Sequence, residues 1–325
     1  MYENFYKLKE KPFSIVPNPD YLYLTEAHQN ALTYLEYGIA ENAGFILLTG
    51  EIGAGKTTLV RHMLNSIGGE LEIAEVFNTN VSPEQLLAMI LTEFGLQSNG
   101  DKSRNLDRLN RHLIGRYGAG KQVLLVIDEA QNLSNEGIEE VRMLSNLQAD
   151  DQLLLQILLV GQPELKYRLQ APGLSQFAQR VAVSCHLEPL NRDETGRYIA
   201  HRLIKAGGSV DLFSDASVDR IYQASAGIPR TVNLLCDAAL VYGYADGQET
   251  IDAALIESVI QDKGGIGMAM PCQYRTEENY KLAARSSRNE LATRLHQLEG
   301  AVSRLETRLE HQIQALEMQA NGYKD

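Results

Sequence analysis

The sequence predicts an α/β core built on a parallel sheet, followed by a smaller all-helical domain and a C-terminal coiled-coil helix. Three observations lead to this fold class. Short apolar strands alternate with helices as far as Pro189, only helices are expected from 191 to 262, and apolar residues recur in heptads beyond residue 285. Apolar strands that alternate with helices are typical of a parallel sheet covered on both faces.

The elements of the core follow from local patterns of apolar residues. Apolar runs of the length of buried strands predict β-structure at 45–49, 72–78, 123–127, 153–160 and 181–187. Apolar residues at helical spacing predict helices at 26–40, 57–65, 83–94, 106–117 and 138–147. Residues 1–24 are rich in proline and aromatic residues, so we expect them to form an irregular arm ahead of the core.

Changes in composition divide the chain into four parts. We expect the core with its arm at 1–190, the helical domain at 191–263, a linker at 264–284 that begins glycine-rich, and the coiled coil at 285–320. So narrow an apolar stripe in the last part favours pairing with itself or with a partner helix over a single helix folded onto the body. The stripe, with alternating steps of four and three residues, consists of Leu291, Leu295, Leu298, Val302, Leu305 and Leu309.

Composition limits the class of partner and the compartment. The 325 residues carry 42 acidic and 30 basic side chains, a formal net charge of −12, which disfavours sequence-independent binding to a nucleic-acid backbone. Three widely spaced cysteines without a CxxC pair indicate structural thiols in a reducing compartment. The N-terminus lacks the apolar core of a signal peptide, and no apolar run approaches the ~20 residues of a membrane-spanning helix. The expected location is therefore cytoplasmic.

The stretch "TGEIGAGKTT" predicts a loop that binds nucleotide phosphates. It fits the pattern GxxxxGK[ST] and lies between a predicted strand and a predicted helix, the context that such a loop requires. Backbone N–H groups of the loop surround the phosphates, the Lys56 cation faces the β and γ oxygens, and the Thr57 hydroxyl suits Mg²⁺. The expected cofactors are ATP and Mg²⁺. The predicted binding residues are Gly50, Glu51, Ile52, Gly53, Ala54, Gly55, Lys56, Thr57 and Thr58.

A second motif, "VLLVIDE" at 123–129, adds two carboxylates at the end of a buried strand. Asp128 is placed to hold the Mg²⁺ shell together with Thr57, and Glu129 is placed to orient and deprotonate the attacking water. The alternative is a solvated acidic pair after a strand. Because a second carboxylate accompanies the phosphate loop, the pair favours hydrolysis over transfer to a bound substrate, and the chain is expected to be an ATPase.

Three further polar residues are candidates for contact with the γ-phosphate. Gln162 follows the strand at 153–160 and can present an amide to the phosphate or the water; a loop cap is the alternative. Arg180 precedes the last strand and could reach the nucleotide of a neighbouring subunit, with a surface salt bridge as the alternative. Arg230 follows a proline at a helix start, which favours anions; pairing with an acid is the alternative.

Together these residues resemble the ExeA/GspA-like family of AAA+ ATPases, including its soluble members associated with exosortase and exopolysaccharide loci. The resemblance implies an AAA+ fold, ATP hydrolysis, and ring-like or filamentous homo-oligomers in which a neighbour completes each site. The matching runs occur in family order over residues 1–262 and are "KPF", "DYLYL", "TGEIGAGKTTLVRHML", "LLVIDEAQNL", "VRMLSNLQ", "LLVGQPEL", "FAQR", "IAHRLIKAG" and "GIPRTVNLLCDAALV".

The resemblance also implies a role for each candidate residue. The arm around Pro12 and Phe13 resembles the lining of the adenine side. Glutamine at 162 departs from the Asn or Thr that is commoner at that position in AAA+ proteins at large. The implied assignments are Walker A for residues 50–58, Walker B for Asp128 and Glu129, sensor 1 for Gln162, arginine finger for Arg180 and sensor 2 for Arg230.

The sequence favours one function class and leaves two others open. The favoured class is an ATPase that assembles or remodels envelope secretion or polysaccharide-export machinery, which it would engage through the coiled coil. Family members can carry a transmembrane helix and a peptidoglycan-binding domain after the ATPase, and neither is seen in this sequence. The expected location therefore remains cytoplasmic, with attachment to the inner membrane through a partner as the alternative. A nucleotide-locked scaffold is a further alternative, which the intact Asp128 and Glu129 disfavour.

The runner-up to the favoured function is a DNA-binding ATPase regulator of the transposition type, since such proteins share the core and the "DEAQ" ending. Arg104, Arg108 and Arg111 lie on one face of a predicted helix and could face a phosphate backbone in the pore of a ring. A solvated basic face is favoured over this, because Asp101 and Asp107 dilute the charge and no aromatic residue interleaves for stacking. Nucleic acid is thus the less favoured partner.

Overall fold

The computed structural model describes residues 1–16, 21–67, 71–149 and 152–263; the predicted coiled coil and most of the predicted linker lie outside the described residues. Strands and helices alternate in the first part of the chain, as the sequence predicts. The elements in chain order are α1 Tyr2–Phe5, α2 Glu26–Ala40, β1 Phe45–Gly50, α3 Lys56–Ser66, β2 Leu71–Val76, α4 Pro83–Glu93, α5 Lys102–Gly118, β3 Gln122–Ile127, η2 Ala130–Asn132, α6 Asn135–Leu144, β4 Gln148–Ala149, β5 Gln152–Leu153, β6 Gln156–Gly161, α7 Pro163–Leu169, η3 Pro172–Leu174, α8 Ser175–Ala178 and β7 Val181–Leu187.

Five of the strands form one sheet in the order β2-β3-β6-β1-β7. Every neighbouring pair in this sheet is parallel. Because parallel strands end at the same edge, the segments that follow β1, β3 and β6 meet at the carboxyl end of the sheet, where ligands of open α/β sheets bind. The predicted phosphate loop, the acidic pair and Gln162 follow these three strands, so the topology gathers them at one edge.

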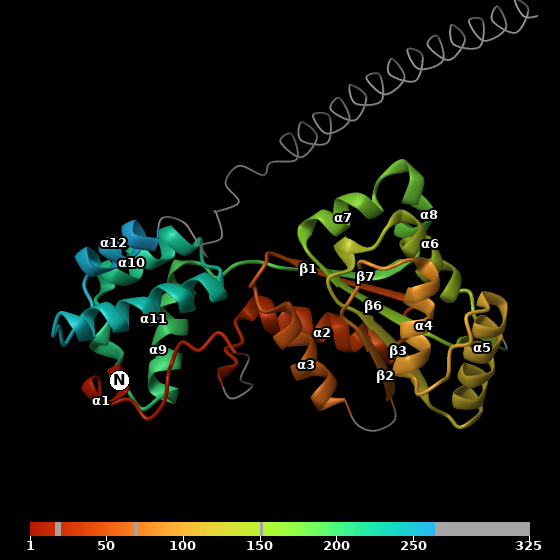
Figure 1. The fold of residues 1–325 in the computed structure, drawn as a ribbon, viewed down its shortest axis with the longest axis horizontal. Helices are drawn as coiled ribbons and strands as arrows, with labels where there is room; N and C mark the ends of the chain where they lie inside the picture. Colours follow the sequence, from red (N-terminus) through yellow and green to blue (C-terminus); the bar gives the residue numbers. More distant parts are fainter. Residues whose placement is uncertain (17–20, 68–70, 150–151, 264–325) are drawn as a thin grey trace, which may run out of the picture. The chain divides into compact units, whose positions relative to one another are not determined.

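Helices cover both faces of the sheet (Figure 1). Side chains of β1 alternate between the two layers: Phe45 and Leu47 pack with α4, α5 and α6, whereas Ile46 and Leu48 pack with α2 and α3. The central strands β1, β3 and β6 are buried on both faces, which is why they read as continuous apolar runs in the sequence. The fold class of the core is therefore the one predicted.

After Pro189 the described chain has no strand, and its helices enclose a separate apolar core. Each helix begins with a residue that caps it or fixes its first turn: Asn191 forms a capping box with Glu194, Ser214 caps the next helix, and Pro229 occupies the first turn of the third. The elements are α9 Arg192–Lys205, η4 Val210–Leu212, α10 Asp215–Ser225, α11 Pro229–Ala245 and α12 Ala253–Lys263.

The N-terminal arm packs with these helices. Tyr2, Tyr6, Leu8 and Phe13 are buried in the same apolar cluster as α9, α10 and α11. The arm also contains the short helix α1, where the sequence predicted irregular structure throughout. Buried Arg202 of α9 holds the arm further along, since its Nε donates to the Pro12 carbonyl oxygen at 2.6 Å and its Nη2 to the Ser14 carbonyl oxygen at 3.3 Å. Residues 1–14 thus complete the helical core.

Several boundaries differ from the prediction, among them those of α6 and β2, and two of the differences have clear local reasons. The strand expected at 153–160 is interrupted: Gln152–Leu153 pairs antiparallel with Gln148–Ala149 in a small hairpin, and the sheet strand begins only at Gln156. Helix α5 begins at Lys102, four residues before the predicted start, because Asp101 caps it by accepting a hydrogen bond from the Arg104 N–H. The spacing of apolar residues alone predicts neither the hairpin nor the capped helix start.

Candidate nucleotide site

The predicted phosphate loop turns sharply between β1 and α3. Gly53 has φ +83° and Gly55 has φ +97°, a backbone region that disfavours side chains. Gly53 is further restricted by contact with α11, because a Cβ atom there would lie 2.5 Å from the Arg230 Cβ. The Arg230 N–H also donates to the Gly53 carbonyl oxygen at 3.3 Å. The loop and the start of α11 therefore touch through backbone.

Lys56, the first residue of α3, is buried beneath the loop. Its Nζ donates to the carbonyl oxygens of Gly50 at 2.9 Å and Glu51 at 3.0 Å. Burial lowers the pKa of Lys56, and the nearby carboxylates of Glu129 and Asp128 act in the opposite direction. A buried ammonium whose hydrogen bonds in the described structure go to neutral carbonyls is suited to an anionic ligand, which would replace them with charge-assisted hydrogen bonds.

Thr57 and Asp128 form the contact expected of a Mg²⁺ site. The Thr57 hydroxyl donates to Asp128 Oδ2 at 2.7 Å, and Asp128 Oδ1 accepts the Glu129 N–H at 2.8 Å. Among the described residues no cluster of three His, Cys, Asp or Glu side chains could hold a metal by itself. Oxygen donors in this small number fit Mg²⁺, which retains waters and takes its other ligands from phosphate.

Glu129 is held by its backbone and by its side chain. It adopts φ +51°, unusual for a residue other than glycine, and the buried Thr79 hydroxyl donates to its carbonyl oxygen at 2.8 Å. Its carboxylate Oε2 accepts from Gln131 Nε2 and, at 3.5 Å, from Gln162 Nε2. Sparsely populated backbone held by neighbouring groups is a recurring feature of functional sites.

Gln162 lies at the carboxyl end of β6 beside this carboxylate. Its N–H donates to Gln131 Oε1 at 3.0 Å, and it is also the residue that precedes the first turn of α7. Its side chain makes no cap hydrogen bond to that helix. The structure thus brings Gln162 to Glu129 by contacts that a loop cap would not make.

Arg180 lies outside the pocket of its own chain. Its guanidinium Nη1 donates to Ser145 Oγ at 3.3 Å and to Asn146 Oδ1, both just beyond α6. The side chain is exposed, and both acceptors are uncharged, so these bonds do not form the salt bridge considered as the alternative. Its predicted role on a neighbour's nucleotide remains a prediction.

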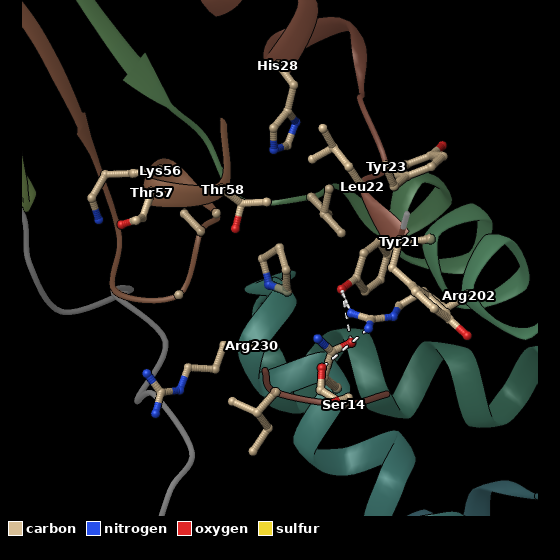
Figure 2. Close-up of a pocket in the computed structure, with 18 of the residues that line it drawn as sticks. Ser14, Tyr21, Leu22, Tyr23, His28, Lys56, Thr57, Thr58, Arg202 and Arg230 are labelled. Atoms are coloured by element: carbon tan, nitrogen blue, oxygen red, sulfur yellow. Dashed lines mark hydrogen bonds between the residues drawn. The ribbon is translucent and has the colours of Figure 1, made fainter. Parts of the chain in front are cut away.

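A cavity of about 300 Å³ lies beside the phosphate loop, and Lys56, Thr57 and Glu129 line it. Lys56, Thr57 and Arg230 lie toward one end, and Tyr21, Tyr23 and Arg202 toward the other (Figure 2). The first group is cationic and polar and suits phosphate. The second group combines aromatic rings with a buried guanidinium and suits a flat heteroaromatic ring.

The ring end of the cavity contains residues that sequence reasoning missed. Arg202 lies over the Tyr21 ring, 4.9 Å from its centroid, and donates from Nη1 to the Tyr198 hydroxyl at 2.7 Å. The Tyr198 hydroxyl in turn donates to Asn233 Oδ1 at 3.0 Å. The runs "IAHRLIKAG" and "GIPRTVNLL", quoted for the family resemblance, contain Arg202 and Asn233 and held the only available signal.

Pro12 and Phe13 do not line this cavity, in contrast to the expectation from the resemblance. Phe13 is 1% exposed and packs edge-on against Phe213 in the helical core. The residues that follow, Ser14, Ile15 and Val16, line the cavity instead. The physical reason is the apolar cluster of the arm, which draws the Phe13 ring inward and leaves the next residues facing the cavity.

His28 is a further residue that the sequence analysis missed. It is 5% exposed, lines the cavity and lies with its Nδ1 2.6 Å from the hydroxyl of Thr25, the residue that caps α2. Burial lowers its pKa, while Glu194 and a hydrogen bond with the Ala54 backbone act in the opposite direction. His28 therefore links the start of α2 to the phosphate loop.

The basic stripe on α5 is internally paired. Arg104 forms an ion pair with Asp101 at 3.6 Å, and Arg111 forms one with Asp107 at 2.6 Å. Arg108 donates to the Gln97 carbonyl oxygen. The two ion pairs agree with the dilution by Asp101 and Asp107 that the sequence indicated, whereas the charge of Arg108 meets only a neutral carbonyl.

Comparisons with known proteins agree with the geometry. A family model described as an AAA domain matches residues 39–169. General secretion pathway protein A of Aeromonas hydrophila is 41% identical over 268 residues, which cover 82% of this chain and 49% of that protein. The chain is an AAA-type relative of general secretion pathway protein A. It spans about half the length of this relative.

Solved structures with similar folds include origin-recognition proteins. Drosophila ORC bound to DNA matches with a TM-score of 0.60 and 16% identity, covering 77% of this chain and 63% of that one. Aeropyrum pernix ORC1 in complex with DNA matches with a TM-score of 0.60 and 15% identity, covering 79% and 70%. At such identities these matches support the fold alone, and they confirm the predicted fold class.

Proposed function

We propose that the chain binds ATP together with Mg²⁺ and hydrolyses it. The observation that supports this most directly is the convergence of Lys56, Thr57 and Glu129 on one cavity, with Asp128 bonded directly behind Thr57. These residues could divide the tasks of phosphoryl transfer to water, which are binding the phosphates, binding Mg²⁺ and accepting a proton from water. Relationship to an AAA domain adds weight to the same reading.

In this proposal the residues act mainly by positioning and charge. Lys56 exchanges the Gly50 and Glu51 carbonyls for β and γ oxygens, and Thr57 with Asp128 holds Mg²⁺, which neutralises charge on the phosphates. Glu129 accepts the proton of the attacking water. Gln162 donates its amide near the γ-phosphate, and the other pocket end holds adenine against Tyr21 and Arg202.

We further propose that the active form is a homo-oligomer, a ring or a filament. Arg180 is exposed and does not line the cavity of its own chain, so in this proposal it acts on the nucleotide of another copy. An arginine supplied by a neighbour contributes about 10³- to 10⁵-fold in rate in comparable systems. This arrangement would make turnover depend on assembly.

The cellular process that ATP hydrolysis would serve is proposed from the relative's name. General secretion pathway protein A is the match by sequence, so assembly or remodelling of secretion or polysaccharide-export machinery from the cytoplasmic side is the favoured role. Within the part of the chain that the structure describes, no helix is long and apolar enough to span a bilayer. The predicted coiled coil at 285–320 would be the surface for partners. A DNA-binding role gains little support from α5, where Arg104 and Arg111 form ion pairs within the helix and its N-cap.

Replacing Lys56 by alanine tests the nucleotide site itself. We expect the Kd for Mg-ATP to rise roughly 10- to 100-fold, because hydrogen bonds to charged groups contribute about 1.5–3 kcal/mol each. Isothermal titration calorimetry measures the Kd, and phosphate release measures turnover. Lys121→Ala removes an exposed lysine just before β3 and serves as the control. A Kd within twofold of the wild-type value would contradict the proposal.

Arg230 is expected to distinguish ATP from ADP. Its guanidinium extends from the start of α11 at the end of the cavity that contains Lys56 and Thr57 (Figure 2). Arg230→Ala should weaken ATP binding about tenfold and ADP binding little, since one charged contact to the γ-phosphate is lost. The ratio of the two Kd values is the measurement. Arg197→Ala removes an exposed charge from α9 as control. Equal loss for both nucleotides would exclude a γ-phosphate contact.

A further inference from the structure

Gln131, two residues after the predicted catalytic base, joins three parts of the site. Its Nε2 donates to Glu129 Oε2, and its Oε1 accepts the Gln162 N–H at 3.0 Å. Its own carbonyl oxygen accepts from Arg168 Nη1. One glutamine side chain therefore spans from the end of β6 to the Glu129 carboxylate, using both ends of its amide.

The surroundings of Gln131 are shaped to keep it in this place. A Cβ atom added at Gly161 would lie 3.0 Å from Gln131 Oε1, so glycine at the end of β6 leaves the room that the amide occupies. Arg168 of α7 fixes the segment from the other side, because its Nη2 donates to the Leu133 carbonyl oxygen at 2.7 Å and to Asn135 Oδ1 at 3.1 Å. The amide is thus held by the N–H that follows β6, and the backbone that carries it is held by α7.

We propose that Gln131 is a positioning residue for Glu129, an inference that rests on the proposed ATP hydrolysis. By donating to Oε2, Gln131 fixes one carboxylate oxygen and the plane of the carboxylate of Glu129, which lines the cavity, and this leaves the other oxygen, Oε1, to accept the proton of water. The second contact, from the Gln162 N–H, ties this orientation to the end of β6. The backbone of Glu129 is held by its left-handed conformation and by the hydrogen bond from Thr79. Gln131 then restricts the rotation of the Glu129 side chain.

Two substitutions separate positioning from a structural role. Gln131→Met keeps the length and removes both amide contacts. Gln131→Glu keeps the shape and an oxygen for the Gln162 N–H, but it removes the donor to Glu129 and puts a like charge beside it. If Gln131 only supports the fold, methionine is the more harmful change. If Gln131 positions Glu129, glutamate is at least as harmful as methionine.

The experiment measures steady-state ATP hydrolysis by the full chain, with the Kd for Mg-ATP and the thermal midpoint as parallel readouts. We expect Gln131→Met to lower kcat about tenfold and Gln131→Glu to lower it at least as much, with KM and Kd within about twofold of wild type. Asn132→Ala, at the exposed neighbouring residue, should leave all three values unchanged.

The outcomes separate this inference from the proposed function. A kcat of Gln131→Glu within twofold of wild type would overturn the inference while leaving ATP hydrolysis intact. A fall in KM and thermal midpoint without a fall in kcat would overturn it as well, because it would indicate a structural role. Failure of the proposed function would instead appear as the absence of ATP turnover by the wild-type chain.

Discussion

Replacing Glu129 by glutamine is expected to lower kcat for ATP hydrolysis about 10²- to 10⁴-fold, the usual contribution of a general base. The amide keeps the size of the side chain but cannot accept the water proton. Lys56, Thr57 and Asp128, which hold the nucleotide and Mg²⁺, are unchanged, so the Kd for Mg-ATP should stay within a few-fold. Phosphate release under saturating ATP measures kcat, and calorimetry measures the Kd.

A matched control and a contradicting result make this prediction sharp. Glu136→Gln makes the same chemical change at an exposed carboxylate in the first turn of α6 and should leave kcat unchanged. Tight ATP binding with turnover equal to wild type in the Glu129 variant would remove this residue as the base. Loss of both binding and turnover would indicate that Glu129 supports the pocket and does not act in the chemical step.

The sequence predicts the core and the phosphate end of the site because both depend on local patterns. An apolar strand, a glycine loop and a helix in succession specify where Lys56 and Thr57 lie, whatever the rest of the chain does. The same holds for Asp128 and Glu129, which the strand Gln122–Ile127 carries to the carboxyl edge. Parallel pairing of β3 with β6 then brings Gln162 beside them, as the alternation of strands implied.

The ring end of the site could not be predicted in the same way, because it is assembled from distant segments. Tyr21, Arg202 and Asn233 lie about 180 and 30 residues apart along the chain, and none belongs to a short motif with a known mechanism. Burial of the arm in the helical core decides which of its residues face the cavity. That is why Phe13 lies in the interior and Ser14 at the cavity.

Gln131 shows the same limit at a shorter range. Its spacing from Glu129 is visible in the sequence, but the donor that orients its amide is the N–H of Gln162, which directly follows another strand. A motif search assigns such a residue to the loop after the acidic pair and gives it no partner. Only the pairing of β3 with β6 reveals that the amide has two partners, the Glu129 carboxylate and the Gln162 N–H.

Replacing Gly227 by alanine is expected to lower the free energy of unfolding by about 2 to 5 kcal/mol, the sum of the cost of a left-handed non-glycine residue and of overpacking. Gly227 has φ +72°, and an added Cβ would lie 1.8 Å from the Leu190 carbonyl oxygen. The overlap is with backbone and cannot be relieved by a side-chain rotation. Leu190 and Gly227 also share a hydrogen bond of 3.0 Å between the Leu190 N–H and the Gly227 carbonyl oxygen.

Gly247→Ala separates the two causes of this loss. Gly247 has φ +67°, yet an added Cβ there would meet no atom within 4 Å, so only the backbone cost of about 1–2 kcal/mol remains. Urea unfolding followed by circular dichroism gives both values. Equal losses at the two glycines would mean that the chain moves away from Leu190. Such a movement would shift the start of α11 and with it Arg230, whose N–H bonds to the Gly53 carbonyl oxygen. Gly227→Ala should then change the ratio of the Kd values for ATP and ADP in the same direction as Arg230→Ala.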